Sequence, residues 1–320
     1  MKRYGNLFTR ICDIENIKLA HKNARKNKTR YKEVIEVDSD IDKYCSQLKE
    51  LLESGKFKNS EYEIFTKLDK GKLREIYKLP YYPDRIVHHA IVQVLEPIWK
   101  STLINDTYQS IKGRGLHKAV KKIQKFVYAN KNELYYIKLD VKKFYPSIDN
   151  IKLKETIRKK IKCVDTLAVL DEIIDSTSGV PIGNYLSQYF GNLFISDIDH
   201  DIKENMQIKQ YYRYCDDIVA IHESKNKLHK CLARIVEMLA HKKLSVKSNY
   251  CLNQINEGLD FLGIIVYCSY SKLRRRIKVS YITKSNAGMS ANTKASYNGW
   301  LLMCNSYRLL CKYNKIKEIL

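Results

Sequence analysis

The residues Tyr211-Tyr212-Arg213-Tyr214-Cys215-Asp216-Asp217-Ile218-Val219-Ala220-Ile221-His222 decide the fold of this chain. Two runs rich in aromatic and β-branched residues flank an acidic pair, which is the pattern of a β-hairpin whose turn carries the acids. Adjacent carboxylates in a tight turn repel one another, and a bound divalent cation is the simplest compensation. A lone Asp-Asp pair is usually an ordinary solvated turn, so the surrounding sequence has to decide between the two readings.

A third carboxylate ends another β-rich run. Residues 135–141 read Tyr-Tyr-Ile-Lys-Leu-Asp-Val, so Asp140 lies at the end of a predicted strand. Mg²⁺ binds one or two protein carboxylates and leaves its other positions to water and substrate phosphates. Two such ions about 4 Å apart can clamp both oxygens of an in-line phosphoryl transfer. Acids in this arrangement are typical of a metal-dependent enzyme that acts on phosphates.

The composition indicates a polyanionic partner. The 320 residues include 58 Lys or Arg and 35 Asp or Glu, which gives a net charge of +23. Residues 1–32 carry ten basic and two acidic residues, and residues 266–320 carry eleven basic residues and one acid. Nucleic acid is the partner that such a charge most often serves.

Other features exclude several classes of protein. A hydrophobic content of 44% argues against a disordered chain, and no apolar run approaches the roughly 18 residues of a membrane span. The nine cysteines include no Cys-x-x-Cys pair, which disfavours a zinc site and a disulfide framework. We therefore expect a cytoplasmic protein with reduced cysteines and no membrane partner.

The periodicity of apolar residues predicts an α+β protein with a boundary near residue 268. Strands are expected in a hairpin at 62–79, at 135–141, in the hairpin at 211–222, at 259–267 and at 276–283. Helices are expected at 6–27, 44–52, 84–99, 117–128, 151–161, 166–176, 185–205, 225–242 and 293–320.

Three segments together resemble the conserved boxes of reverse transcriptases. Residues 214–217 (Tyr-Cys-Asp-Asp) resemble the YxDD box, residues 139–149 resemble the first acidic motif, and residues 259–263 (Leu-Asp-Phe-Leu-Gly) resemble the FLG box. Their order and spacing follow the family, and the resemblance extends from about residue 6 to residue 313. It implies an RNA-directed DNA polymerase with a right-hand fold. Residues 1–268 would form the fingers and a palm whose antiparallel sheet is backed by helices, and residues 269–320 a short, basic, helical thumb.

The resemblance also implies roles for individual residues. The catalytic residues would be Asp140, Asp216 and Asp217, which with Val141 would hold two Mg²⁺ ions, or Mn²⁺ in their place. The nucleotide would be bound by Lys72, Arg74, Tyr145, Ile182, Gly183 and Lys247. Template and primer would be contacted by Lys112, Arg114, Gln188, Phe261, Leu262 and Gly263. From the residues alone, a solvated helix face is the alternative for the basic cluster that contains Lys112 and Arg114, and a buried strand is an equal alternative for 261–263.

One box indicates a subtype. Residues 180–188 read Val-Pro-Ile-Gly-Asn-Tyr-Leu-Ser-Gln, with Ile182 where the family usually has Gln and Gln188 where it usually has Pro. This form is similar to the reverse transcriptases of diversity-generating retroelements. The resemblance implies a template RNA copied with errors at adenines, replacement of a variable gene region by the cDNA, and a small, basic, oligomeric accessory protein. Because Ile can neither donate nor accept a hydrogen bond, we expect relaxed discrimination at insertion.

Two alternatives stay open. One is a reverse transcriptase of another bacterial type, from a group II intron, a retron or a phage-defence system. The other is a non-catalytic RNA-binding protein that keeps the fold. The retained Asp140, Asp216 and Asp217 argue against the second, because a protein without catalysis has no reason to keep crowded like charges.

Overall fold

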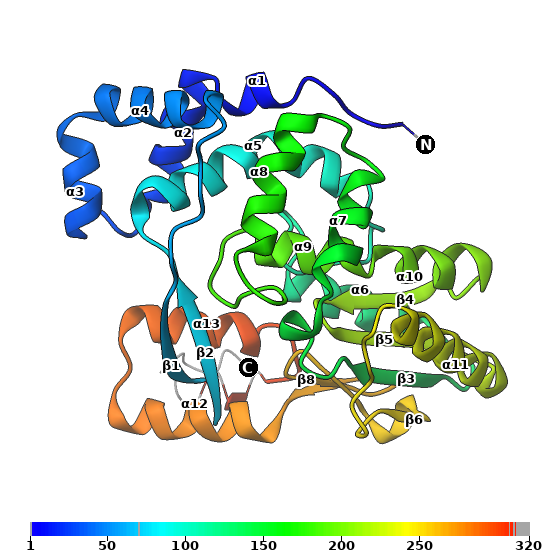
Figure 1. The fold of residues 1–320 in the computed structure, drawn as a ribbon. Coiled ribbons are helices and arrows are strands. Elements are labelled where there is room, and N and C mark those ends of the chain that lie inside the picture. Colours follow the sequence, from blue (N-terminus) through cyan, green and yellow to red (C-terminus); the bar gives the residue numbers. More distant parts are fainter. Residues whose placement is uncertain (1, 70, 307, 310, 312–320) are drawn as a thin grey trace. The chain divides into compact units, whose positions relative to one another are not determined.

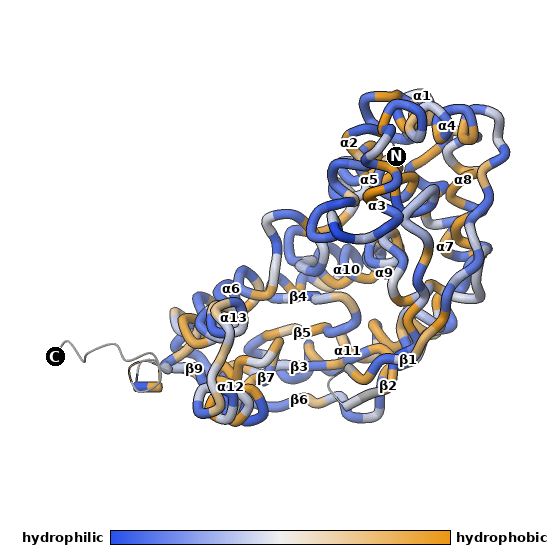
Figure 2. The backbone as a smooth tube through the Cα atoms, turned by 90° about the vertical axis from the view of Figure 1, so that its left-hand side faces the viewer, coloured by the Kyte–Doolittle hydropathy of each residue, from blue (hydrophilic) through white to orange (hydrophobic). Residues whose placement is uncertain are grey.

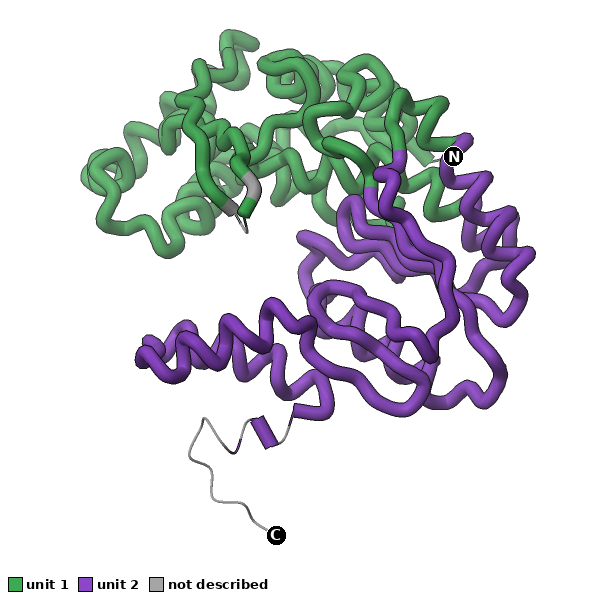
Figure 3. The backbone as a smooth tube through the Cα atoms, turned by 90° about the horizontal axis from the view of Figure 1, so that it is seen from below, with its two compact units in different colours: residues 1–104, 141–200, 238–245 green, residues 105–140, 201–237, 246–320 purple. Residues whose placement is uncertain are grey.

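A computed structural model of the chain describes residues 2–69, 71–306, 308–309 and 311 (Figure 1). These residues form two compact units, each assembled from separate stretches of sequence (Figure 3). Unit 1 contains residues 1–104, 141–200 and 238–245, and unit 2 contains residues 105–140, 201–237 and 246–320. The predicted helix at 293–320 lies partly outside the described residues.

Unit 1 is mainly helical and carries one two-stranded sheet. Its centre is the apolar helix α5 (Ile86–Lys100), against which α2 (Ile14–Ala24) packs. The sheet is an antiparallel hairpin of β1 (Glu63–Asp69) and β2 (Lys72–Lys78), as predicted. The other elements are α1 (Phe8–Ile11), α3 (Lys32–Ser39), α4 (Ile41–Glu53), η1 (Tyr81–Arg85), η2 (Tyr145–Ser147), α7 (Asn150–Arg158), α8 (Val164–Asp175), α9 (Ser187–Phe194) and α10 (Ser196–His200).

Unit 2 is built on a four-stranded antiparallel sheet of order β4-β5-β3-β6. These strands are β3 (Tyr135–Asp140), β4 (Gln210–Tyr214), β5 (Asp217–His222) and β6 (Cys251–Gln254). A second, three-stranded antiparallel sheet contains β7 (Leu259–Phe261), β8 (Ile264–Val266) and β9 (Ser271–Leu273). The remaining elements are α6 (Leu116–Ala129), η3 (Asp201–Asn205), η4 (Ile255–Glu257), α12 (Arg275–Ala287), α13 (Ala291–Leu301), and α11 (Lys225–His241), which continues into unit 1.

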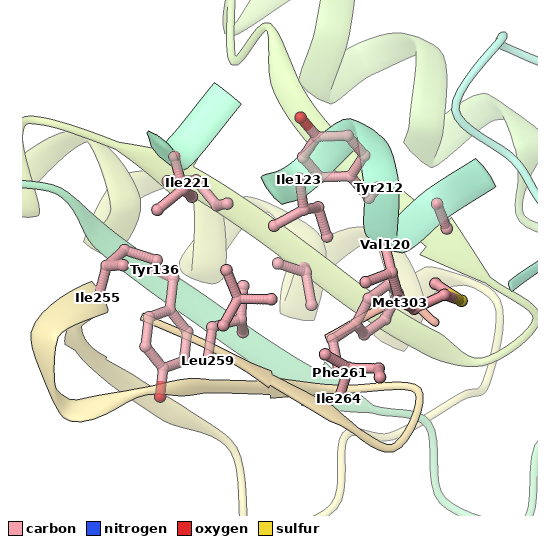
Figure 4. Close-up of a cluster of buried hydrophobic side chains, with 14 of the residues drawn as sticks. Val120, Ile123, Tyr136, Tyr212, Ile221, Ile255, Leu259, Phe261, Ile264 and Met303 are labelled. Carbon is pink, nitrogen blue, oxygen red and sulfur yellow. The ribbon is translucent and has the colours of Figure 1, made fainter. Parts of the chain in front are cut away.

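The core of unit 2 fixes the position of its strands. Apolar side chains from α6 meet those of both sheets in one buried cluster (Figure 4). Strand β5 is largely apolar (Figure 2), and its residues 218–221 are all buried. Because successive side chains of a strand point to opposite faces, both faces of the sheet are covered at β5. The cluster includes Val120, Ile123, Tyr136, Tyr212, Ile221, Ile255, Leu259, Phe261, Ile264 and Met303.

The predicted strand at 276–283 is wrong, because these residues lie within helix α12. The sequence alternates Ile277, Val279 and Tyr281, which favours a strand. In the structure Val279 is 52% exposed, whereas Tyr281 is buried and Ile277 packs against the core. Ile277 and Tyr281 are four residues apart, the spacing of one helix face, and that spacing describes the segment correctly.

Two further predictions need correction. The long helix expected at 185–205 is interrupted at Ile195, where φ is −113° and ψ is 14°, so α9, α10 and η3 follow one another. The single strand expected at 259–267 is a hairpin, β7 and β8, whose turn lies at Leu262 and Gly263. Both residues of this turn have positive φ angles, which end an extended run.

Candidate active site

The turn between β4 and β5 presents the acidic pair. Tyr214 and Asp217 are paired in register, so Cys215 and Asp216 form a two-residue turn. Cys215 has a φ of 60°, a conformation that costs a non-glycine residue about 1–3 kcal/mol. The fully buried Arg213 donates from Nη1 to the carbonyl oxygen of Cys215 at 3.1 Å. Unit 2 thus maintains a strained turn at the point where the carboxylates lie.

Asp140 lies directly opposite Asp217 in the register of β3 and β5. Like charges facing each other across a sheet are destabilising. Asp140 Oδ2 is 2.5 Å from Lys247 Nζ, and the Lys247 backbone N–H donates to the Asp140 carbonyl oxygen at 2.8 Å. Asp140 Oδ1 is buried and has no hydrogen-bond partner. The predicted trio therefore comes together at the ends of adjacent strands, with one carboxylate oxygen unsatisfied.

The three carboxylates perturb one another. Burial, reinforced by the charges of Asp140 and Asp217, raises the pKa of Asp216 to about 6. Burial and the charge of Asp140 also raise the pKa of Asp217, against the opposing effect of Lys138, Lys247 and Arg274. Groups with raised pKa values in such a cluster are typical of a functional site.

Lys138 and Arg274 belong to this cluster, and the sequence analysis missed both. Lys138 Nζ donates to the Asp260 carbonyl oxygen at 2.6 Å. Arg274 donates from Nε and Nη2 to Asp260 Oδ1 at 2.9 and 2.6 Å. A signal for Lys138 existed, because residues two apart on a strand share a face and Lys138 precedes Asp140 by two. Arg274 lies between β9 and α12, directly before the segment at 276–283 that was wrongly predicted as a strand.

The donor set fits a hard divalent cation, which prefers carboxylate oxygens. The unsatisfied Asp140 Oδ1 and the mutual repulsion of the acids are both relieved by a bound cation. Among the described residues, however, no group of three or more His, Cys, Asp or Glu side chains is arranged to hold a metal ion by itself. Val141 follows Asp140 directly, and since a valine side chain has no ligand atom, only its carbonyl oxygen is a possible ligand.

Unit 1 contains five of the six predicted nucleotide-binding residues, all but Lys247. The Tyr77 N–H on β2 donates to the Ile182 carbonyl oxygen at 2.8 Å. Gly183 has a φ of 121°, and a Cβ at this position would lie 2.5 Å from the Tyr77 carbonyl oxygen. The strand that contains Lys72 and Arg74 is therefore tied to the Ile182–Gly183 turn. Arg74 is exposed, and the side chain of Lys72 lies outside the described part.

A pocket of about 210 Å³ adjoins this turn within unit 1, lined in part by Ile76, Arg85, His88, Gly183 and Tyr185. His88 Nε2 and Arg85 Nε are buried in it without hydrogen-bond partners. Burial lowers the pKa of His88 to about 3, so its ring is neutral.

Tyr145 follows the buried Phe144 in unit 1, and their ring centroids are 5.3 Å apart. The Tyr145 carbonyl oxygen accepts a hydrogen bond from the Val180 N–H at 3.0 Å. Gln188 is exposed in the first turn of α9. Tyr145 and Gln188 are thus held by the segments that flank the Ile182–Gly183 turn in sequence.

The predicted nucleic-acid contacts of unit 2 differ in their accessibility. Lys112 is exposed, and Arg114 Nη2 donates to Asn105 Oδ1 at 3.3 Å. Phe261 is 1% exposed, so its side chain belongs to the core, in agreement with the buried strand that the sequence also allowed. Leu262 and Gly263 form the turn beside it, where a Cβ on Gly263 would lie 2.3 Å from the Trp300 ring.

The fold and the acidic strand ends are those of the right-hand polymerase fold. Residues 58–266 match the family model described as "Reverse transcriptase (RNA-dependent DNA polymerase)", and the chain belongs to this family. Protein YkfC of Escherichia coli K12 is 22% identical, in an alignment that covers 62% of this chain and 65% of that protein.

The solved structures agree on the fold. Apo telomerase of Candida tropicalis, truncated from its C-terminal domain, has a TM-score of 0.53 at 16% identity, over 68% of this chain and 55% of that one. Candida tropicalis telomerase in complex with a TWJ fragment of telomeric RNA has a TM-score of 0.52 at 14% identity, over 73% and 49%. The chain thus spans less than two thirds of these relatives. The predicted α+β right-hand polymerase fold is confirmed.

Among the described residues, the helices include none that is both long and apolar enough to cross a membrane.

Proposed function

We propose that this protein is an RNA-directed DNA polymerase, in which a primer 3′-hydroxyl attacks the α-phosphate of a dNTP and pyrophosphate leaves. The observation that carries the proposal is the convergence of Asp140, Asp216 and Asp217 at adjacent strand ends, with Asp140 Oδ1 unsatisfied. Membership of the reverse transcriptase family supports it. Template RNA, a primer and dNTPs are the partners that this reaction requires.

The three aspartates, with the Val141 carbonyl, would hold Mg²⁺ or Mn²⁺. Bound divalent cations supply charge neutralisation to the phosphates during in-line transfer. Lys138, Lys247 and Arg274 oppose the rise in the pKa of Asp217 that burial and Asp140 cause, and so favour its ionised form. Lys247 now pairs with Asp140. Its proposed second role, beside the leaving pyrophosphate, requires that this ion pair opens when Asp140 binds a cation.

The remaining contacts follow from charge and shape. Arg74 and Lys72 on β2 would bind the triphosphate, since an Arg fork and a Lys ammonium both suit phosphate. Tyr145 would crowd a ribose 2′-hydroxyl and so favour dNTPs over rNTPs. Lys112 and Arg114 would contact template phosphates, and the Leu262–Gly263 turn the primer end. We retain residue 268 as the proposed boundary between palm and thumb.

Primer extension on a defined RNA template tests the proposal. Wild-type protein should extend a labelled primer with dNTPs and Mg²⁺, and Asp216→Asn should not. Asp201→Asn is the matched control, because Asp201 lies in the same unit but pairs with Arg234 on α11. RNA binding by wild type without any synthesis, in Mg²⁺ or Mn²⁺, would favour the non-catalytic alternative.

A finer proposal concerns fidelity. The Ile182–Gly183 turn is hydrogen-bonded to β2 through Tyr77. The family resemblance puts a Gln amide at position 182, and Ile cannot make the hydrogen bonds with which that amide would orient a nucleotide. We infer synthesis with errors at template adenines, as in diversity-generating retroelements. Ile182→Gln should lower the error rate opposite adenines, measured by sequencing the products. If the wild-type protein already copies accurately, the protein is instead a reverse transcriptase of the intron-like, retron or defence type.

The accessory protein implied by this subtype is itself basic, as is this chain at +23. Two basic proteins repel one another electrostatically, so we propose that shared RNA bridges the two. Nuclease treatment should then separate a co-purified pair. A complex that survives complete RNA digestion would contradict the bridge.

A further inference from the structure

Gly191 is a glycine in the interior of a helix, a position where glycine is destabilising. It lies inside α9 (Ser187–Phe194) and is buried, and its φ is not positive, so alanine could adopt the same backbone. Glycine in a helix interior costs about 1 kcal/mol relative to alanine. Neither conformation nor propensity therefore explains glycine here, and the reason has to be the space that a side chain would fill.

The space beside Gly191 that a side chain would enter is bordered by two aromatic rings. A Cβ added at Gly191 would lie 3.0 Å from Phe144 Cε1, 3.0 Å from Tyr145 Cε1 and 3.6 Å from Tyr145 Cζ. The two contacts at 3.0 Å, one to each ring, are tighter than ordinary carbon contacts, so the rings would have to give by a few tenths of an ångström. Phe144 is 3% exposed and surrounded by the core, whereas Tyr145 is only partly buried. Tyr145 is the ring that can give way.

The backbone around Tyr145 leaves the ring little other freedom. The Tyr145 carbonyl oxygen accepts from the Val180 N–H at 3.0 Å. A Cβ on Gly179 would lie 2.4 Å from the Pro146 carbonyl oxygen, which shows how closely the two segments approach. Since the backbone is clamped, the contact with α9 at Gly191 sets the position of the Tyr145 ring edge.

We propose that Gly191 is a positioning residue that sets the sugar discrimination of this polymerase through Tyr145. This inference rests on the proposed function, in which Tyr145 meets the ribose. A side chain at 191 pushes the partly buried Tyr145 ring away from α9. The space available to a 2′-hydroxyl shrinks, while the residues that touch metal and phosphate are unchanged.

The test is single-nucleotide insertion of a dNTP and of the matching rNTP, with kcat/KM measured for each. Gly191→Ala should raise the dNTP/rNTP ratio by about 3-fold or more and raise KM for the dNTP, and Gly191→Ser should have the larger effect. In a Tyr145→Ala background, Gly191→Ala should leave the ratio unchanged, because residues that act through one another are not additive. Gly5→Ala is the matched control, since its Cβ meets only the flexible Lys162 side chain.

The possible outcomes distinguish a failure of the role proposed for Gly191 from a failure of the role proposed for Tyr145. If Tyr145→Ala changes the ratio and Gly191→Ala does not, the inference is overturned and Tyr145 keeps its role. If Gly191→Ala changes the dNTP/rNTP ratio equally in wild type and in the Tyr145→Ala background, the inference is also overturned. If Tyr145→Ala itself leaves the ratio unchanged, the proposed role of Tyr145 fails, and the inference with it. Thermal unfolding of each variant confirms that it is folded.

Discussion

Asp216→Asn should make the protein more stable while it removes activity. Burial and two neighbouring carboxylates raise the pKa of Asp216 from its ordinary 3.8 to about 6. One pKa unit corresponds to about 1.4 kcal/mol, so the ionised form costs the folded state about 3 kcal/mol at pH 8. At pH 5 most folded molecules carry a protonated Asp216, and the cost is roughly half as large.

The sign of the pH dependence follows from this. A carboxyl with a raised pKa in the folded state costs stability increasingly as the pH rises from about 4 through about 6. The stabilisation by Asp216→Asn should therefore grow from pH 5 to pH 8 by roughly 1–2 kcal/mol. Urea unfolding in EDTA measures it, because the chelator removes any stabilisation by bound cations.

The control variant, Asp201→Asn, should change the stability in the opposite direction. The Arg234 guanidinium hydrogen-bonds Asp201 and lowers the pKa of that carboxyl, so Asp201→Asn should destabilise the protein, and less so as the pH falls. If Asp216→Asn is no more stable than wild type at pH 8, or its effect is the same at pH 5, the carboxylates do not repel one another as described.

Three further outcomes are expected. Lys247→Met should move the acid limb of the pH–rate profile to higher pH, because Lys247 lowers the pKa of Asp217, and an unmoved limb would contradict that role. Gly183→Ala should destabilise the chain by about 1–3 kcal/mol in urea, since φ is 121° and the Cβ would meet the Tyr77 carbonyl oxygen, and a neutral result would refute this geometry. Phe261→Ala should cost about 3–5 kcal/mol, as for a core aromatic. A loss of primer extension at unchanged stability would instead make Phe261 a contact residue.

Local patterns predicted the acidic strand ends. The β-rich runs on both sides of Asp216 and Asp217, and the run ending at Asp140, are short-range signals, and the structure forms these strands. The hairpin at 62–79 was predicted in the same way from its turn. Short sequence motifs of this kind locate the site, because each motif forms the strand end that carries its carboxylate.

Long-range packing was not predictable in the same way. Arg274 reaches the cluster through Asp260, and nothing in the sequence around it predicts that contact. Ile277, Val279 and Tyr281 alternate like a strand, but burial of two of them on one face makes the segment a helix. The sequence left open whether Phe261 lies near the primer end or in a buried strand, and its place in the core depends on both sheets and α6. The role of Gly191 depends on rings more than forty residues earlier in the chain.

The most direct test of the account is to sequence the product that purified protein makes from an RNA template of defined sequence with dNTPs and Mg²⁺. The account predicts an alkali-resistant DNA strand complementary to the RNA from wild type and from Asp201→Asn, and none from Asp216→Asn. Equal synthesis by Asp216→Asn, or RNA binding by wild type without any DNA product, would contradict it.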